Sequence, residues 1–475
     1  MQFNSLAYAI FLPLVFFIYW FIAGNNVKRQ NLLLLMASYF FYGWWDWRFL
    51  GILVFTTLVD YFLAIRISRA SSERNRKLWL ALSLFMNLGL LCFFKYWNFF
   101  VDSWITAWAS AGIQMNPLTV SVILPIGISF YTFQELSYTL DVYKKRMEPV
   151  RDLVGFAAFI TFFPQLVAGP IEKASAFLPQ FLKSRHFSAQ QAIVGCRLIL
   201  WGLVKKIVIA DNLAVYVNDI YKNYDVLPGS VLLLGSALFA FQIYADFSGY
   251  SDIALGSAKL LGFDLVKNFN RPYISKSITE FWTRWHISLS SWFREYLYIP
   301  LGGNRVSIPR WSLNIMITFL VSGLWHGASF TFVIWGALHG LMILLERYFS
   351  LSFKFKAASG NWLLNAGLVL KTFTITTFIW IFFRATSIEQ AFEIIHKIFT
   401  SFTVGSWNLN YLRAIWLIVF CIVIEYLSRK NEYVIFVPTR TMPSYLLFAI
   451  EIVLGLLVID SSITLDHDQF IYFQF

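Results

Sequence analysis

The 475-residue chain is 58% hydrophobic and only 13% charged, whereas soluble domains carry about 25% charged residues. Its formal net charge of +12 does not indicate a nucleic-acid binder, because the basic residues collect in short loops between apolar runs. The composition therefore predicts an all-α, polytopic integral membrane protein. We expect one membrane-embedded domain over residues 1–475, with about ten to twelve transmembrane helices.

Clusters of basic residues mark the expected ends of the first transmembrane spans. Residues 1–24 are apolar and lack a basic leader or a small-residue cleavage site, so they predict a retained first span. Basic residues at 28–29 and 66–77 are typical of cytoplasmic loops, so two spans are expected between them. Residues 31–43 are short for a crossing of about 20 residues, which suggests a tilted or incomplete span.

The next part of the chain crosses twice and then breaks. Residues 78–100 lead to an expected outer loop at 102–117, which contains no Lys or Arg, and residues 118–140 return to the inside. The apolar segment 155–173 has basic loops on both sides and contains two prolines and an internal glycine. A broken, re-entrant hairpin keeps both loops inside, and irregular backbone at that depth lines a cavity or lies buried in protein.

The second half is expected to start with spans at 192–210 and 231–247, joined by an outer loop near 211–228. Residues 259–310 contain eight Lys or Arg and three Asp or Glu, which predicts a cytoplasmic loop. Its aromatic residues are typical of interfacial helices lying on, or dipping into, the inner face. Further spans are expected at 311–330, 331–345, 366–383, 411–426 and 445–459, leaving the last residues outside.

Two histidines lie in the apolar stretch 321–340, VSGLWHGASFTFVIWGALHG. Ionisable side chains at membrane depth are costly and invite a functional explanation. His326 has small neighbours, Gly323 and Gly327 among them, which leave room for a substrate or for another backbone. His339 follows Trp335 by four residues, so packing of its ring on that tryptophan explains it without a function.

Two motifs carry a resemblance to a known family. FWTRWHISLSSWFREYLYIPLGGNR is followed about forty residues later by GLWHG, and the pair resembles the membrane-bound O-acyltransferase family in its bacterial alginate O-acetyltransferase branch. QIYADFSGYSDIALGSAKLLGFDLVKNFNRPY and the closing FIYFQF resemble that branch too. The resemblance implies helices around a central tunnel and transfer of an acyl group, usually acetyl, from a cytoplasmic thioester to a polysaccharide outside. By position, His326 matches the family's catalytic histidine and His286 its second recurrent polar position.

The chemistry supports the same two residues. Acyl transfer to a hydroxyl needs a base, and imidazole titrates near neutrality. The alternative for His326 is a buried core histidine bonded to a backbone carbonyl, and for His286 an anchor at the membrane interface. Candidate substrate-binding residues are Trp325, Trp282, Arg284 and Arg294; the arginines would hold coenzyme A phosphates, or equally bind anionic lipid.

Weaker clusters have simpler explanations. Asp246 and Asp252 could orient a histidine or act as acid and base, but pairing with local Lys or Arg is the favoured interpretation. Residues 466–468, Asp-His-Asp, could suggest a metal site, yet adjacent residues cannot converge on one ion without a sharp bend. We expect no metal and no permanently bound cofactor, with acetyl-CoA or another acyl thioester as donor substrate.

The sequence favours an acetyl-transferring enzyme of the bacterial inner membrane, with an extracytoplasmic acetyltransferase partner and a polysaccharide acceptor. Two alternatives stay open. One is D-alanyl transfer to teichoic acid, and the other is a transporter that carries an acyl group and leaves the chemistry to a partner. Transporters usually contain paired broken helices, and only residues 155–173 fit that pattern here. The acceptor, the donor and the oligomeric state stay undetermined by sequence.

Overall fold

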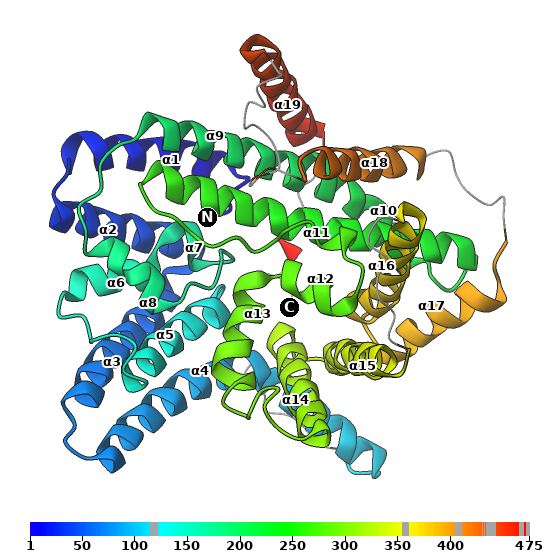
Figure 1. Ribbon diagram of the computed structural model, residues 1–475, viewed down its shortest axis with the longest axis horizontal. Coiled ribbons are helices and arrows are strands. Elements are labelled where there is room, and N and C mark those ends of the chain that lie inside the picture. The colour runs from blue at the N-terminus through cyan, green and yellow to red at the C-terminus, as the bar shows by residue number, and fades with distance from the viewer. Residues whose placement is uncertain are drawn as a thin grey trace. The chain divides into compact units, whose positions relative to one another are not determined.

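The computed structural model describes residues 1–114, 122–353, 361–403, 411–429, 431, 433, 443–464 and 470–471. These residues form helices and connecting segments, with no β-strand among them (Figure 1). They belong to two compact units, one of Met1–Ala192 with Ser257–Val266 and one of Ile193–Gly256 with Lys267–Phe475. Six helical segments of the described chain are long and apolar enough to cross a membrane: Val27–Arg69, Glu73–Ser110, Gly229–Leu260, Phe330–Phe349, Trp362–Arg384 and Tyr445–Thr464. The chain is therefore an all-α, multi-pass membrane protein, as predicted.

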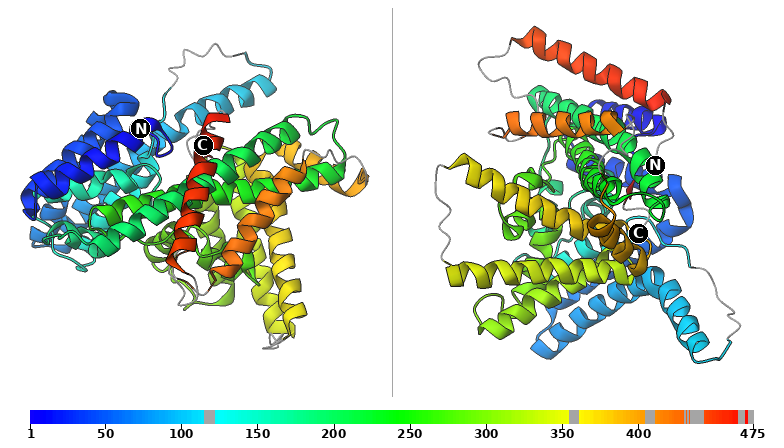
Figure 2. Two further views of the ribbon diagram at one scale, coloured as in Figure 1. Left: turned by 90° about the horizontal axis from the view of Figure 1, so that it is seen from above. Right: turned by 90° about the vertical axis from the view of Figure 1, so that its right-hand side faces the viewer.

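The first unit is built from the N-terminal helices. They are α1 (Leu6–Phe17), α2 (Val27–Asp46), α3 (Leu50–Arg69), α4 (Glu73–Ser110), α5 (Ile128–Tyr143), α6 (Leu153–Thr161), α7 (Phe163–Leu166) and α8 (Ala174–Phe177), with π- or 3₁₀-helical segments η1 (Ile18–Ile22), η2 (Trp47–Phe49) and η3 (Leu178–Phe181). Helices α3 and α4 pack side by side across a three-residue turn (Figure 2). The predicted break in 155–173 is present, because α6 and α7 are short and residues 167–173 are not helical.

The second unit contains the rest of the helices. They are α9 (Ala189–Leu203), η4 (Val204–Ala210), α10 (Asp211–Lys222), α11 (Gly229–Leu260), η5 (Pro272–Ile274), α12 (Ile278–Arg284), α13 (Ile287–Phe293), η6 (Arg294–Tyr298), α14 (Ile308–His326), α15 (Phe330–Phe353), α16 (Trp362–Arg384), α17 (Ile388–Thr400), α18 (Tyr411–Leu427) and α19 (Ser444–Thr464). The first residues of α9 and the last of α11 are assigned to the first unit. A continuous core of aromatic and aliphatic side chains joins α10, α11, α15 and α16.

Three predicted loops and spans were wrong in their bounds, and each error has the same cause. Helix α2 has 20 residues, because its polar first turn begins at the cap Asn26 and was excluded from the apolar run. Helix α4 runs on to Ser110, into the expected outer loop, of which 115–117 lie outside the described residues. The expected loop at 211–228 is helical to Lys222. Polar residues that marked loops in the sequence lie inside helices here.

Helices α9 and α11 cross closely, and this crossing brings two lysines that follow α9 next to carboxylates of α11. Gly202 and Gly249 face each other, and a Cβ on either one would lie 2.6 or 2.7 Å from the carbonyl oxygen of the other. The helices therefore approach more closely than any side chain permits. Lys205 and Lys206, which follow Gly202, form ion pairs with two carboxylates of α11, the partly exposed Asp252 (2.7 Å) and the buried Asp246 (2.8 Å). The predicted pairing of these aspartates with local lysines is confirmed.

A polar cluster between α3 and α4 gives a stability prediction for the first unit. The buried Asp60 carboxylate accepts hydrogen bonds from Ser83 Oγ (2.6 Å) and Asn87 Nδ2 (2.7 Å). Asp60→Ala removes both bonds, and the donors keep only their longer contacts, Ser83 Oγ to Thr139 Oγ1 (3.2 Å) and Asn87 Nδ2 to the Ser83 carbonyl (3.1 Å). The loss should be about 1–2 kcal/mol, given the modest value of interhelical hydrogen bonds in membranes. Asp60→Asn keeps an acceptor oxygen and should cost less. Thermal unfolding in detergent measures both, and equal losses would contradict this account.

Candidate active site

His326 ends α14 and lies in an aromatic enclosure. Its side chain is 3% exposed. The ring centroid lies 4.9 Å from that of Trp335 on α15, 5.3 Å from that of Phe383 on α16 and 5.0 Å from that of Trp325. The three rings exclude water from most of the imidazole, so a proton transfer at this ring is shielded from solvent.

His286 comes from a different element but lies beside His326. It precedes α13, is fully buried, and its ring centroid is 6.5 Å from that of His326 and 5.9 Å from that of Trp325. Its backbone has φ 42° and ψ 55°, the left-handed region that a non-glycine residue rarely occupies. Such strain persists where the surroundings over-determine it and often accompanies function. The structure thus brings together the two histidines that the sequence singled out.

The loop around His286 is held by hydrogen bonds to Asn268. Ile287 N–H donates to the Asn268 carbonyl at 2.9 Å, and Ser288 Oγ donates to Asn268 Oδ1 at 2.6 Å. Asn268 is itself buried and donates from Nδ2 to Ser251 Oγ of α11 at 3.1 Å. These bonds tie the strained turn to α11 and hold the backbone that follows His286.

Burial lowers the pKa of the His286 imidazole from 6.5 to about 3, which predicts a pH dependence of stability. Between those two values the unfolded chain binds a proton at this ring and the folded protein does not. The stabilising contribution is therefore fully present above pH 6.5 and declines as the pH falls. We expect His286 to lower the free energy of unfolding by about 1 kcal/mol between pH 7.5 and pH 5.5, and His286→Gln to reduce the total difference between these pH values by that amount. Thermal unfolding at both pH values tests this; an unchanged difference in the variant would contradict it.

A large cavity of about 1400 Å³ lies next to the histidine pair in the second unit. Trp282 and Arg294 line it, as does Ser322, which precedes His326 by one helical turn of α14. Most of its wall is apolar, and its cationic side chains are Lys276, Arg294, Arg347 and Lys371. Neither histidine is among its lining residues, so the predicted continuous tunnel to His326 stays a prediction.

The four candidate substrate-binding residues separate into three groups. Trp282 and Arg294 line the cavity. Trp325 packs against both histidine rings. Arg284 lies outside the cavity lining and makes an ion pair with Glu280 at 2.8 Å, so its guanidinium already has a carboxylate partner.

The glycines beside His326 do not leave room for a substrate. A Cβ on Gly323 would overlap the carbonyl oxygen of Phe332, and a Cβ on Gly327 would overlap the Phe332 ring. The small residues let α15 approach α14, which is the second of the two roles considered from sequence. A bulky residue at Gly323 would therefore push α14 away from α15, so we expect it to disturb the fold as well as turnover.

The position of His339 agrees with the packing interpretation drawn from the sequence. His339 packs on Trp335 with ring centroids 5.0 Å apart, and its Nδ1 accepts a hydrogen bond from Trp282 Nε1 at 3.3 Å. His186 and His396 are exposed. The candidate metal cluster at 466–468 lies outside the described residues.

Sequence reasoning missed the residues that enclose the site from other helices. Trp335, Phe383 and Ser322 have no motif of their own, because aromatic and small residues are common throughout the chain. Lys276, Arg347 and Lys371 looked like ordinary loop or helix-end charges.

Comparison with known proteins identifies the family. Residues 144–388, which include both histidines, match the membrane-bound O-acyltransferase family. The chain is 40% identical to the probable alginate O-acetylase AlgI of Pseudomonas aeruginosa, over 85% of this chain and 75% of that protein. It is 36% identical to the peptidoglycan O-acetyltransferase of Helicobacter pylori, over 81% of this chain and 77% of that protein. It is 25% identical to the teichoic acid D-alanyltransferase of Bacillus subtilis, over 54% of this chain and 75% of that protein. The chain belongs to the membrane-bound O-acyltransferase family and is an O-acyltransferase.

Proposed function

We propose that this protein moves an acetyl group from a cytoplasmic thioester, acetyl-CoA, to hydroxyls of an extracytoplasmic polysaccharide, directly or through a partner acetyltransferase. Its place is the bacterial inner membrane. The relatives named for alginate and peptidoglycan O-acetylation support an acetyl donor and a polysaccharide acceptor. The teichoic acid D-alanyltransferase matches a smaller share of this chain at lower identity, which makes D-alanyl transfer the second candidate.

The observation that carries the proposal is the buried pair of histidines, with ring centroids 6.5 Å apart, next to a large apolar cavity with a basic side. His326 takes the proton from the acceptor hydroxyl as its oxygen attacks the thioester carbonyl. The tetrahedral intermediate collapses, the carbon–sulfur bond breaks, and the departing thiolate receives the proton. His286, which burial keeps neutral, can donate a hydrogen bond from its protonated ring nitrogen to the carbonyl oxygen as negative charge develops there.

The cavity is the proposed site of the donor. Its apolar wall suits the pantetheine arm, and the cations Lys276 and Arg294 suit the phosphates of coenzyme A through charge-assisted hydrogen bonds. Lys371 also lines the cavity but pairs there with Glu346 at 3.6 Å. Trp282, held by its hydrogen bond to His339, offers a flat indole surface on the wall. The donor is a substrate in this scheme, and no permanently bound cofactor is required.

Sealed membrane vesicles of defined orientation test the function. Acetyl-CoA with an isotopic label in the acetyl group is supplied on the cytoplasmic side, and the label is followed as O-acetyl ester on the opposite side together with release of the CoA thiol. We expect both products in equal amounts. Labelled acetyl-CoA crossing intact would support the transporter, and transfer of D-alanine in preference to acetyl would support the second enzyme.

The side of the donor site has its own test. In a chain lacking Cys92, Cys196 and Cys421, single cysteines are placed in the segment 259–310 and in residues 102–114. An impermeant thiol reagent should label only the second set in intact cells, because charge bias places the basic segment in the cytoplasm. Labelling of the 259–310 set in sealed cells would contradict a cytoplasmic donor.

A further inference from the structure

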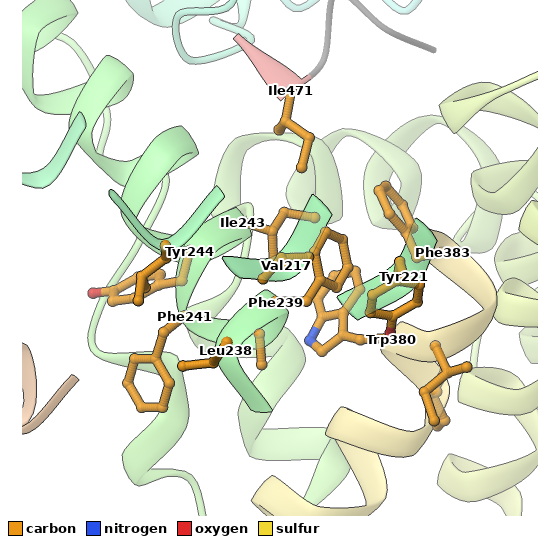
Figure 3. Packing of buried hydrophobic residues seen from close by; sticks show 14 of the residues in the cluster. Val217, Tyr221, Leu238, Phe239, Phe241, Ile243, Tyr244, Trp380, Phe383 and Ile471 are labelled. Atoms are coloured by element: carbon orange, nitrogen blue, oxygen red, sulfur yellow. The ribbon is translucent and has the colours of Figure 1, made fainter. Parts of the chain in front are cut away.

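The chain at residues 470 and 471 lies in the core of the second unit, against helices that are remote from it in sequence. Phe470 is 2% exposed and Ile471 5% exposed. The Ile471 side chain points toward Ile243 and the core cluster (Figure 3). The Ile471 N–H donates to Asp246 Oδ2 of α11 at 2.7 Å. A carboxylate in an apolar core thus accepts a hydrogen bond from the main chain of a segment 225 residues away.

The charges around Asp246 explain why it needs that donor. Lys206 Nζ lies 2.8 Å from Asp246 Oδ1 and 2.8 Å from Asp211 Oδ1, and all three side chains are nearly fully buried. One ammonium group faces two carboxylates, so Asp246 shares its cation with Asp211. Buried charge is tolerated when further hydrogen bonds satisfy it. The Ile471 N–H supplies such a bond at the second oxygen of Asp246.

One face of α11 connects this bond to the histidine pair. Asp246 and Tyr250 have the i, i+4 spacing, and Phe247 and Tyr250 the i, i+3 spacing, that place residues on one side of a helix. Phe470 stacks on Tyr250 at a centroid distance of 4.4 Å and lies 5.8 Å from Phe247. The Phe247 ring then meets the His286 ring edge-on at 4.7 Å. A continuous series of ring contacts therefore joins residue 470 to His286.

We propose that Asp246 is a positioning residue, which anchors the chain at Ile471 and thereby holds the aromatic packing that orients His286; its catalytic consequence rests on the proposed function. If only apolar contacts held residues 470 and 471, this segment could shift by one residue along α11 at little cost. A single buried hydrogen bond to a charged acceptor opposes this shift, because the shifted state leaves the carboxylate short of a donor. The anchor matters for His286 because its left-handed backbone needs surroundings that hold it.

The first test measures the anchor without substrate. In a chain lacking the three native cysteines, Ile471→Cys is combined with Asp246→Leu and, as matched control, with Asp211→Leu. Each of these removes one carboxylate from Lys206 and leaves it paired with the other, but of the two aspartates it is Asp246 that bonds residue 471. We expect thiol labelling to become about tenfold faster or more in the first combination, as local opening exposes the residue, and to stay slow in the control. Equal labelling rates in the two combinations would overturn the anchor.

The second test measures positioning. Asp246→Leu should lower kcat for acetyl transfer by about tenfold or more, since small displacements of catalytic groups cost that much, with the KM for acetyl-CoA within about twofold of the parent value. Asp246→Asn, which keeps an acceptor for the N–H, should restore most of kcat. From the other side, Ile471→Pro deletes the N–H and should reproduce the loss, whereas Ile471→Val keeps it and should not. Faster labelling of the thiol introduced at position 471 with unchanged kcat would overturn the positioning role, and the labelling result stands even where acetyl transfer itself is refuted.

Discussion

His326→Ala is expected to reduce acyl transfer by about two to four orders of magnitude, the loss typical for removal of a general base. The ring lies among Trp325, Trp335 and Phe383, where no solvent-exposed group can replace it. Acetylation of the polymer in cells, and thiol release by purified protein, measure the effect. The amount of protein in the membrane should stay close to that of the parent, because the aromatic enclosure survives.

The matched control for this prediction is His339→Asn. His339 is also buried and packs on the same Trp335, and an asparagine oxygen can replace Nδ1 as acceptor for Trp282 Nε1. We expect a loss of less than about tenfold there, because no proton transfer is assigned to this ring. Near-normal acetylation with His326→Ala, or equal losses in both variants, would contradict a base at His326.

Gly323→Ala is expected to destabilise the protein itself. The added methyl group meets the Phe332 carbonyl oxygen of α15, and backbone cannot rotate away as a side chain does. Gly336 of α15 faces the Phe319 carbonyl of α14 in the same way, so the two helices cross at glycines from both sides. Overpacking of this kind costs about 1–3 kcal/mol. Because the added methyl group meets backbone, we expect the destabilisation by Gly323→Ala to lie at the upper end of this range.

The matched control is Gly367→Ala on α16, where no atom lies within 4 Å of the added Cβ. Alanine in a helix is favoured over glycine by about 1 kcal/mol, so this variant should be neutral or slightly more stable. Thermal unfolding in detergent and the yield of monodisperse protein measure both. A stable Gly323→Ala variant that has lost only turnover would restore the interpretation that these glycines leave room for a substrate.

The sequence was sufficient to predict that this chain is embedded in a membrane, but not where its helices begin and end. Long apolar runs need a bilayer or a buried core, and few alternatives exist for them. The observed helix ends differ from the predicted ones wherever polar residues continue a helix. Asp211 starts α10 as a direct continuation of η4 and pairs with Lys206, a compensation between residues five positions apart that no hydropathy window detects.

The two histidines of the site could be predicted from the sequence, but the residues that surround them could not. His286 and His326 stand in recognisable motifs, but their proximity depends on how α12, α13 and α14 fold back on α11. The enclosing Trp335 and Phe383 come from α15 and α16, whose packing is a property of the tertiary structure. The glycines beside His326 illustrate the limit most clearly, since the same small residues admit a ligand or a neighbouring helix, and only the position of Phe332 decides between them.

The roles of the cavity and of the two histidines can be checked together in a cryo-EM structure with a non-hydrolysable thioether analogue of acetyl-CoA bound. We expect the coenzyme moiety in the cavity lined by Trp282 and Arg294, and the acetyl carbonyl between the two histidine rings, within about 3 Å of a ring nitrogen of one of them. An analogue bound elsewhere on the protein, or a carbonyl separated from both rings by the intact aromatic enclosure, would contradict it.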